Sequence, residues 1–376
     1  MSGKIINLSS ADPKFLPDYI EQARKYVPDH DKRSIYFFYG NNIPEKLRIP
    51  GVQVHSVPNN MDSLAELKDF FEPGDVLVSH SFSTMQLKLL KNLPEGVKKV
   101  WILWGWELYN AIPRSHYVEF WSHYHSQKDP FYKFFLKRIY NKYWVDPSPK
   151  VKEIVSQFDY MATYIDTDYE LAKNFNNKLK HIDFRYVPNK FQHFSLPAFN
   201  FSPLQLKKPE KIKLLLGNST APTNNHFEAL RYLKRIKFPG IIYCPLSYGS
   251  QEKYVKNLIE TGTSMYGNRF NPITKFMSRN DYMGFLAGID VFWFNNIRQM
   301  SMGNILIAFL MGKPVIFNPK SFMIPFFRKL GLTFFTSFQF SEIEKKFDIN
   351  TAQQNREIVK NLWDVKNNTA FFELIG

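Results

Sequence analysis

The 376-residue sequence has one cysteine, no long apolar run and, over one stretch, no acidic residue. The single cysteine, Cys244, excludes an intrachain disulfide and a cysteine-based zinc cluster. The longest apolar runs, such as Ile305 to Met311, are far shorter than the roughly 20 residues of a membrane-spanning helix. The N-terminal sequence MSGKIINLSS lacks the apolar core of a signal peptide. We therefore expect a soluble or peripheral protein in the cytoplasm, a reducing compartment.

Acidic residues are absent from Val291 through Ser341, a stretch that holds several basic ones. These are Arg298, Lys313, Lys320, Arg328 and Lys329. Over the whole chain, 49 Lys and Arg against 34 Asp and Glu give a formal net charge of +15. Such an excess indicates an anionic partner: nucleic acid, an anionic membrane face or a phosphorylated ligand. The acid-free stretch favours a phosphate site, although a chance run in a basic protein would look the same.

Short apolar runs alternate with amphipathic stretches, which predicts an α/β fold, and the length suits two domains. Predicted strands of the first half are Lys4–Leu8, Ser34–Tyr39, Asp75–Ser79, Lys99–Leu103, Tyr160–Ile165 and His181–Val187. Helical patterns between them include Leu16–Tyr26 and Ser63–Phe71. Three prolines and no periodicity mark Phe191 to Lys211 as an interdomain linker.

A second α/β series follows the linker, with predicted strands Lys213–Leu216, Gly240–Cys244, Val291–Phe294 and Pro314–Phe317. Its predicted helices include Asn225–Ile236, Gln251–Glu260, Asp281–Leu286 and Met302–Met311. We predict two doubly wound, Rossmann-like domains, 1–195 and 210–350, that face a central cleft. For the helical segment 351–376, a return to the N-terminal domain is one alternative. Ligands of such sheets bind beyond the carboxyl ends of the strands.

The strongest local motif is Leu214-Leu215-Leu216-Gly217-Asn218-Ser219, a buried strand that runs into a small-residue turn and then a helix. Free N–H groups at the helix start, with Gly217 allowing close backbone approach, would bind a diphosphate. The alternative is a plain turn, with Thr223 or Asn224 as the helix N-cap. A second loop of this kind, from Asn295 to Asn304, joins a strand to a helix and carries Arg298.

Two N-terminal motifs also follow predicted strands. The sequence Trp101-Ile102-Leu103-Trp104-Gly105-Trp106-Glu107-Leu108-Tyr109 suits an aromatic sugar-binding wall with Glu107 as a polar contact or base, or in part a plain core. His80 follows another strand, where a structural role is the alternative. Asp166-Thr167-Asp168 resembles an Asp-x-Asp metal motif, but we interpret Asp168 as a helix N-cap and expect no metal.

The segment from Tyr117 to Trp144 interleaves aromatic residues with lysine and arginine. Its part FYKFFLKRIYNKYW is predicted to form a helix with an aromatic and a basic face. Such helices adsorb to anionic membranes. A core helix with a solvated basic face and a surface for single-stranded nucleic acid are the alternatives.

Taken in order, these motifs resemble a bacterial glycosyltransferase family, family 56, the TDP-N-acetylfucosamine:lipid II N-acetylfucosaminyltransferase (4-alpha-L-fucosyltransferase) family. The resemblance rests on WILWGWELY (Trp101–Tyr109), LLLGNSTAPTNNHFEAL (Leu214–Leu230), CPLSYGSQEKYV (Cys244–Val255), DYMGFLAGIDVFWF (Asp281–Phe294), RQMSMGN (Arg298–Asn304) and GKPVIFN (Gly312–Asn318). The Gly-Asn-Ser and Trp-Gly-x-Glu blocks are the most specific.

The resemblance implies a GT-B fold, no metal or other cofactor, and a dTDP-activated deoxy- or amino-deoxyhexose donor, fucose- or Fuc4NAc-like. It implies a lipid-linked saccharide acceptor at the inner face of the cytoplasmic membrane, where the protein would be peripheral, in surface-glycan synthesis. It also favours a role for His80, since the family has a histidine at this strand end.

On this basis we expect a hexosyltransferase whose catalytic residues are Glu107, His80 and Arg298. Expected donor-binding residues are Gly217, Asn218, Ser219, Asn225, His226, Tyr248, Gln299, Gly303 and Asn304. Expected acceptor-binding residues are Trp104, Trp106 and Tyr109. The alternatives are a nucleotide-sugar epimerase of the same two-domain shape and a basic nucleic-acid-binding protein.

Overall fold

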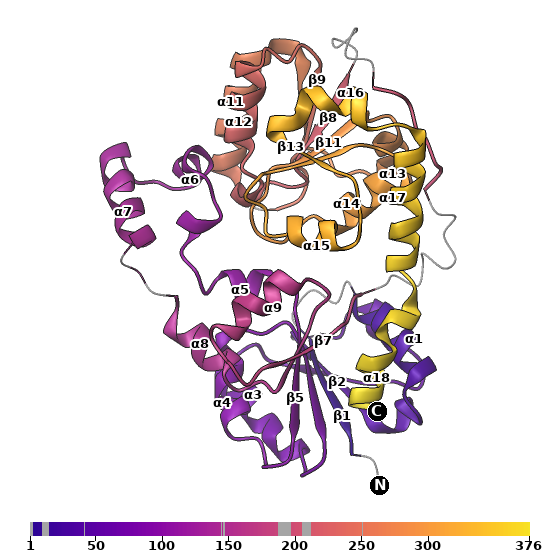
Figure 1. Cartoon of the computed structure of the whole chain (residues 1–376). Coiled ribbons are helices and arrows are strands. Elements are labelled where there is room, and N and C mark those ends of the chain that lie inside the picture. Colours follow the sequence, from indigo (N-terminus) through magenta and orange to yellow (C-terminus); the bar gives the residue numbers. More distant parts are fainter. Residues whose placement is uncertain are drawn as a thin grey trace. The chain divides into compact units, whose positions relative to one another are not determined.

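Parallel strands and helices alternate along the chain in the computed structural model, which describes residues 3–9, 15–40, 42–143, 145, 147–186, 197–204, 212–249 and 251–376 (Figure 1). The chain divides into two units. Unit 1 comprises Met1–Ile112, Asp146–Ser195 and Trp363–Gly376. Unit 2 comprises Pro113–Val145 and Leu196–Leu362. These units differ from the predicted domain ranges in two places. The aromatic-basic segment, predicted within 1–195, belongs to unit 2, and the residues from Trp363 onward belong to unit 1.

Unit 1 contains a parallel sheet in the order β3-β2-β1-β4-β5-β6-β7. Its strands are β1 Ile5–Ser9, β2 Ser34–Tyr39, β3 Gln53–Val57, β4 Val76–His80, β5 Lys98–Ile102, β6 Tyr160–Ala162 and β7 Lys180–Ile182. All residues of β1 and β4 are buried, as expected for parallel strands covered on both faces. Every strand predicted for this half is present, and the last two are shorter than predicted. The edge strand β3 is mostly exposed, and its sequence QVHSV gave no apolar run to predict it from.

Helices cover both faces of this sheet. The helices are α1 Leu16–Tyr26, α2 His30–Arg33, α3 Met61–Glu66, α4 Leu87–Lys91, α5 Trp106–Tyr109, α8 Pro149–Val155, α9 Asp166–Lys173 and α18 Thr369–Ile375. One apolar cluster joins α3, α4, α8 and α9 to the sheet, and a second joins α1 and α18. Phe372 of α18 stacks on Tyr26 of α1 with ring centroids 5.4 Å apart, which explains why the C-terminus belongs to unit 1.

Unit 2 contains a parallel sheet in the order β10-β9-β8-β11-β12-β13. Its strands are β8 Lys213–Leu216, β9 Ile241–Pro245, β10 Phe270–Ile273, β11 Val291–Phe294, β12 Val315–Phe317 and β13 Phe335–Thr336. The predicted strands here are all present, and β10 and β13 are additional. Of the predicted linker, residues 197–204 are described, and Phe199 and Phe201 pack against the core of unit 2. The rest of the linker lies outside the described residues.

The helices of unit 2 are α6 Phe120–His125, α7 Phe131–Tyr143, α11 His226–Arg235, α12 Glu252–Tyr266, α13 Arg279–Ala287, α14 Met302–Leu310, α15 Ile324–Lys329, α16 Ile343–Lys346 and α17 Ile349–Leu362. The predicted aromatic-basic helix is therefore present as α7. In the part of the chain that the structure describes, no helix has the length and apolar character needed to cross a membrane.

Candidate functional site

The carboxyl edge of the unit 2 sheet carries the motifs that the sequence singled out. The chain begins this sheet in the middle at β8, extends it through β9 and β10 on one side, and returns to add β11 on the other side. The loops after β8 and β11 therefore diverge at a topological switch point, where doubly wound sheets bind ligands. These loops contain Gly217–Asn225 and Asn295–Ser301.

Gly217 follows β8 in a left-handed conformation, with φ of 70°. A Cβ at this position would lie 2.5 Å from His226 Nε2 and 3.0 Å from Asn224 Oδ1, so a side chain has no room. Burial lowers the pKa of His226 to about 3, which leaves the ring neutral, and its Nδ1 lies 3.1 Å from the Tyr254 hydroxyl. The ring therefore supports the loop and brings no positive charge to it.

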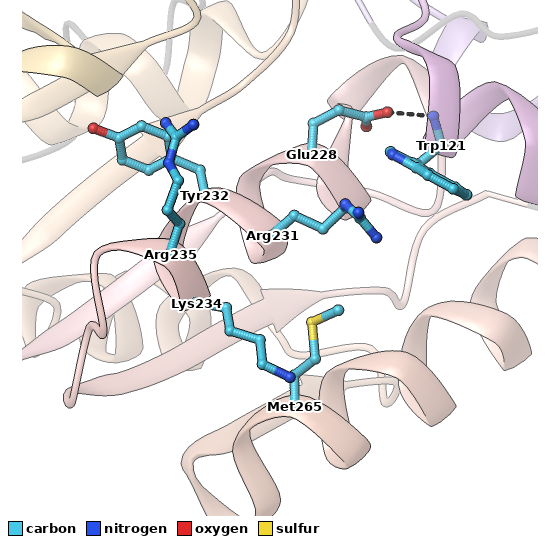
Figure 2. Close-up of a pocket in the computed structure, with 7 residues that line it drawn as sticks. All are labelled: Trp121, Glu228, Arg231, Tyr232, Lys234, Arg235 and Met265. Carbon is cyan, nitrogen blue, oxygen red and sulfur yellow. Dashed lines mark hydrogen bonds between the residues drawn. The ribbon is translucent and has the colours of Figure 1, made fainter.

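The N-terminus of α11, which the sequence predicted as a diphosphate site, is covered by α6. Ser122 Oγ of α6 accepts the N–H of Phe227 at 3.3 Å. In return the Glu228 carboxylate of α11 accepts the N–H of Trp121, as Figure 2 shows. It also accepts the N–H of Ser122 at the start of α6. The two helices cap each other, which satisfies backbone groups that a helix leaves unpaired at its start. This reciprocal cap occupies the Phe227 N–H, one of the groups that the predicted diphosphate site would use.

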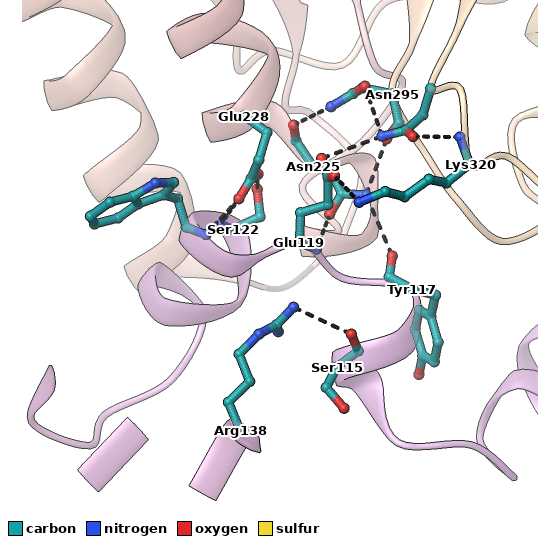
Figure 3. Close-up of polar contacts among 11 residues, drawn as sticks. Ser115, Tyr117, Glu119, Ser122, Arg138, Asn225, Glu228, Asn295 and Lys320 are labelled. Carbon is teal, nitrogen blue, oxygen red and sulfur yellow. Dashed lines mark hydrogen bonds and ion pairs between the residues drawn. The ribbon is translucent and has the colours of Figure 1, made fainter. Parts of the chain in front are cut away.

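Three asparagines join the carboxyl edge of the sheet to the segment before α6 (Figure 3). Asn225 accepts the backbone N–H of Glu119 at 2.8 Å, and it exchanges side-chain-to-backbone hydrogen bonds with Asn295. Asn318 donates to Asn295 Oδ1 at 3.1 Å. Asn225 is fully buried, and its side chain is used by these contacts.

Glu119 brings a carboxylate to the carboxyl edge of the unit 2 sheet. The loops that follow β11 and β12 at this edge contain no acidic residue. The Glu119 carboxylate lies 3.5 Å from Lys320 Nζ and accepts from Asn318 Nδ2 at 3.3 Å. Burial and the neighbouring charge of Glu228 raise the pKa of Glu119, whereas Lys320 lowers it. Sequence reasoning missed this residue because it comes from a segment more than 100 positions away from the sheet.

The N-terminus of α14 has a different environment. Its N-cap, Ser301, is in a left-handed conformation and makes no side-chain cap hydrogen bond. Gly303 is exposed, and a Cβ there would meet no atom within 4 Å. The first N–H groups of α14 have no intrahelical acceptor, and the helix dipole favours an anion beside them. The open helix N-terminus at this switch point is therefore that of α14.

The other predicted donor residues surround the two loops. Arg298 Nη1 donates to the Gln299 carbonyl at 3.2 Å, and Asn304 Nδ2 donates to the Tyr282 hydroxyl at 3.0 Å. The Asn218 N–H is already used by Asn224, with a distance of 3.3 Å. Tyr248 has an exposed ring, and its carbonyl accepts the N–H of Thr220 at 2.9 Å, which ties the loop after β9 to the loop after β8.

Several buried polar atoms of these two loops have no hydrogen-bond partner among the described residues. They are Thr223 Oγ1, His226 Nε2, Asn296 Oδ1 and Ser301 Oγ. Buried polar groups are normally paired, so a group of unpaired ones indicates a place where water or a ligand binds. Their location on both sides of the switch point agrees with the open N-terminus of α14.

In unit 1, His80 belongs to a buried chain of hydrogen bonds. Trp104 Nε1 donates to the Tyr186 hydroxyl at 3.0 Å, and this hydroxyl lies 2.6 Å from His80 Nδ1. His80 Nε2 lies 3.2 Å from Asn7 Oδ1, so Nε2 carries the proton and Nδ1 accepts from Tyr186. Burial lowers the pKa of His80 to about 3. These contacts favour a positioning role, in which His80 fixes Tyr186 and Trp104.

Glu107 and Tyr109 are also buried. Glu107 Oε1 accepts from Trp101 Nε1 at 3.1 Å and from the Trp104 N–H at 2.8 Å. Burial raises the pKa of Glu107 to about 7, although these hydrogen bonds lower it. The Tyr109 hydroxyl donates to Asp168 at 2.5 Å, so Tyr109 lies in the core and not on a binding surface.

Trp104 is half-buried and Trp106 is exposed. Phe15 stacks on Tyr186 at 5.2 Å and meets Trp104 edge-on at 5.8 Å. Together Phe15, Trp104 and Tyr186 form an aromatic cluster at the carboxyl ends of β1, β4 and β5. Phe15 and Tyr186 were missed because neither belongs to a recognisable motif.

The prediction that Asp168 caps a helix is wrong. Helix α9 begins at Asp166 with Ile165 as its N-cap, and Asp168 lies inside the first turn, where Tyr109 binds its carboxylate. No group of three or more His, Cys, Asp or Glu side chains that would suit a metal ion occurs within the described ranges.

The model of the 4-alpha-L-fucosyltransferase family, glycosyl transferase group 56, matches residues 159–374. The chain belongs to this family. Its assignment to glycosyltransferases that transfer hexoses is thereby established, in preference to an epimerase or a nucleic-acid-binding protein.

Solved structures with low identity share the fold. HepE of Anabaena in complex with UDP is 14% identical with a TM-score of 0.64, and the match covers 99% of each chain. Trehalose 6-phosphate synthase of Burkholderia multivorans is 8% identical with a TM-score of 0.64, over 100% of this chain and 96% of that one. A glycosyltransferase of Rickettsia africae is 13% identical with a TM-score of 0.63, over 100% and 99%. The predicted GT-B fold class is confirmed.

The close approach at Gly217 gives a first prediction. Gly217→Ala forces a Cβ against His226 and Asn224 in a left-handed backbone, so the free energy of unfolding should fall by about 2 kcal/mol. Chemical denaturation followed by circular dichroism measures this change. Gly284→Ala is the matched control, because a Cβ at Gly284 of α13 meets no atom within 4 Å. The control should be neutral or gain up to about 1 kcal/mol. Equal behaviour of the two variants would contradict the loop geometry.

The burial of Glu107 gives a second prediction, a dependence of stability on pH. Its folded pKa of about 7 lies above the ordinary 4.5, so its stabilising contribution is present below pH 4.5 and is lost as the pH rises through 7. Between about pH 5 and about pH 8, the free energy of unfolding of the wild type should fall by about 2 kcal/mol more than that of Glu107→Gln. Denaturant titrations at both pH values test this.

Glu170→Gln serves as the control for the pH experiment, since Glu170 is an exposed residue of α9. This variant should keep the pH dependence of the wild type. If Glu107→Gln keeps it too, the Glu107 carboxyl is not titrating in a buried environment.

Proposed function

We propose that this chain transfers a deoxy- or amino-deoxyhexose from a dTDP-activated donor to a lipid-linked saccharide in bacterial surface-glycan synthesis. Unit 2 binds the donor, and unit 1 contributes the acceptor surface. The observation that carries the donor half is the open N-terminus of α14 at the switch point of the unit 2 sheet. Family membership and the UDP bound by the similar HepE structure support a nucleotide-sugar donor.

The diphosphate would bind the N–H groups of Met302, Gly303 and Asn304 at the start of α14, next to the loop of Gly217 and Ser219. Arg298 lies in the loop that leads into α14 and supplies positive charge. Its charge, together with that of Arg114, lowers the pKa of Tyr117 against the larger effect of burial, which raises it. Tyr248 and Gln299 would contact the base or the sugar.

The reaction breaks the bond between the anomeric carbon and the β-phosphate oxygen, and the acceptor oxygen takes the phosphate's place on that carbon. The leaving diphosphate gains negative charge, which fixed N–H groups and Arg298 stabilise without reorganising. In this proposal the charge of the leaving group is met by protein groups, and no metal takes part. The acceptor hydroxyl gives its proton to solvent water as the new bond forms.

Unit 1 would present the acceptor saccharide to the aromatic cluster of Phe15, Trp104 and Tyr186, because sugars stack on aromatic faces. Trp106, which is exposed, lies on the same short helix as Glu107 and adds to this surface. His80 and Glu107 hold the cluster in place: His80 binds Tyr186, and Glu107 binds the N–H of Trp104.

Helix α7 supports a peripheral membrane location. Tyr132, Leu136, Tyr140 and Tyr143 are between 58% and 67% exposed, and their spacing of four, four and three places them on one face of the helix. Lys133 and Lys142 flank this aromatic stripe. Aromatic rings flanked by lysines are typical of helices that lie in the membrane interface. We propose that the aromatic stripe of α7 contacts the membrane that holds the lipid-linked acceptor.

Replacement of Arg298 tests the transferase proposal. In an assay with a dTDP-sugar and a polyprenyl-diphosphate-linked saccharide, Arg298→Ala should lower kcat by about a hundredfold with the fold intact, because a donor to the leaving group is lost. Arg328→Ala, which removes an exposed arginine of α15 from the same acid-free stretch, should keep wild-type turnover. Near-normal turnover by Arg298→Ala would remove Arg298 from the mechanism.

Two conditions of the same assay and one binding measurement test the remaining parts of the proposal. Donor without acceptor should give no epimerised sugar. Chelation of divalent cations with EDTA should leave the rate unchanged. Thermal shifts with dTDP, UDP and GDP should be largest with dTDP, because ligand binding to the folded state raises stability.

Membrane binding is tested by changing the aromatic stripe. Tyr132→Ser with Leu136→Ser and Tyr140→Ser should weaken binding to phosphatidylcholine vesicles by about tenfold or more, because less apolar area leaves water. Vesicle co-sedimentation measures this. Phe276→Ser with Phe338→Ser is the control, because these rings are 82% and 69% exposed and lie outside α7. Similar losses in both sets would contradict a specific role of α7.

A further inference from the structure

The loops at the carboxyl edge of the unit 2 sheet form a row in the order of its strands. Because this order is β9-β8-β11-β12, the loop after β9 lies on one side of the proposed diphosphate site and the loop after β12 lies on the other. Neighbouring strands are about 4.8 Å apart, so β9 and β12 are separated by about 14 Å. A donor that extends along this row has its nucleoside on one side and its sugar on the other, because the diphosphate joins the two.

The two sides of this row offer different chemistry. The β9 side presents Tyr248, whose ring is 64% exposed and suits stacking on a base. The β12 side presents the carboxylate of Glu119, the amide of Asn318 and the ammonium of Lys320. These groups suit the hydroxyl and N–H groups of a hexose, so the row favours the nucleoside at the β9 side and the sugar at the β12 side.

Glu119 is fixed at the β12 side through its backbone and its side chain. Its N–H donates to Asn225 Oδ1 at 2.8 Å, and Asn225 Nδ2 donates to the Asn295 carbonyl at 3.1 Å. Its Oε2 accepts from Asn318 Nδ2 at 3.3 Å, and Figure 3 shows Lys320 pointing toward it. Because the edge of the sheet holds both its backbone and its side chain, the carboxylate is kept in one place.

The β12 side is continuous with the open N-terminus of α14. The Ile297 carbonyl, in the loop after β11, accepts the N–H of Phe322, in the loop after β12, at 2.8 Å. From Ile297 the chain runs through Arg298 to Ser301, the N-cap of α14. Glu119 and the proposed diphosphate site therefore adjoin the same pair of joined loops.

The Glu119 carboxylate has room for further hydrogen bonds. Within the described residues it accepts one side-chain hydrogen bond, from Asn318, and its ion pair with Lys320 is 3.5 Å long. An ionised carboxylate accepts about four hydrogen bonds and donates none. The side chain is 20% exposed, so a ligand can reach it. The ligand group that binds it must be a hydroxyl or an N–H, since the carboxylate repels a phosphate.

We propose that Glu119 is a specificity-determining residue that accepts hydrogen bonds from hydroxyl or N–H groups of the donor's hexose. This role rests on the proposed function, because it takes a diphosphate bound at α14 as its starting point. Lys320 keeps the carboxylate ionised and oriented. A sugar that lacks the donating group leaves the carboxylate unpaired, which discriminates against that sugar more strongly than a change of apolar contact does.

Binding of two ligands to the full chain, measured without acceptor by isothermal titration calorimetry, tests this role. Glu119→Gln should raise the Kd of dTDP-Fuc4NAc by about tenfold or more, because a hydrogen bond to a charged group is lost. The Kd of dTDP should stay at the wild-type value, since dTDP lacks the hexose. Lys320→Gln, which changes an exposed side chain, should raise the Kd of dTDP-Fuc4NAc by about threefold and leave that of dTDP unchanged.

Glu342→Gln is the matched control, because it also removes a carboxylate that pairs with a lysine on unit 2, in this case Lys346 at 2.6 Å. It should leave both Kd values unchanged. An unchanged Kd of dTDP-Fuc4NAc in Glu119→Gln would overturn the role, and a lower kcat in that case would assign the carboxylate to proton transfer instead. An equal loss of affinity for dTDP and dTDP-Fuc4NAc would overturn it as well, because the hexose would then make no difference.

The outcomes also separate this role from the proposed function. A Kd of dTDP-Fuc4NAc that depends on Glu119, without any transfer to the lipid-linked saccharide, supports the sugar contact and removes the proposed reaction. Transfer by Glu119→Gln with unchanged donor Kd and KM supports the reaction and removes the sugar contact.

Discussion

The reciprocal cap between α6 and α11 decides what unit 2 can bind and where. Ser122 occupies the start of α11, and Glu228 occupies the start of α6, so two helix ends that would otherwise attract anions satisfy each other. The asparagines 225, 295 and 318 then attach the chain before α6 to the edge of the sheet. As a result the open helix N-terminus at the switch point is that of α14, and the donor site follows from this arrangement.

The same contacts explain why the aromatic-basic segment belongs to unit 2. Although it follows the strand motif of unit 1 in sequence, its backbone N–H groups are satisfied by Asn225 and Glu228 of unit 2. Arg138 of α7 adds a hydrogen bond to the Ser115 carbonyl at 3.3 Å, so α7 is joined to the same segment. The proposed membrane helix and the proposed donor site are therefore parts of one unit.

The fold could be predicted because buried parallel strands appear in the sequence as continuous apolar runs. The edge of the sheet where ligands bind could be predicted because α/β folds bind ligands at the carboxyl ends of their strands. The roles of single side chains could not be predicted from the sequence. Asn225 with Glu228 three residues later reads as a local capping pattern, yet Glu228 turns to α6, more than 100 residues earlier in the chain. His80 and Glu107 have the residue types of a base, but their burial and their hydrogen bonds to Tyr186, Trp101 and Trp104 follow from tertiary packing, which spacing does not encode. An asparagine directly after β11 and after β12 was a visible signal of a polar edge that sequence reasoning left unused.

The central claim is that a nucleoside diphosphate binds between the loop after β8 and the N-terminus of α14. Hydrogen–deuterium exchange of the full chain, with and without dTDP, tests it most directly, because bound phosphate slows exchange of the N–H groups that it accepts. We expect slowed exchange in peptides covering 217–220 and 301–304, with no change at the start of α11, which α6 already covers. Slowed exchange at residues 226–229 without any at 301–304 would contradict it.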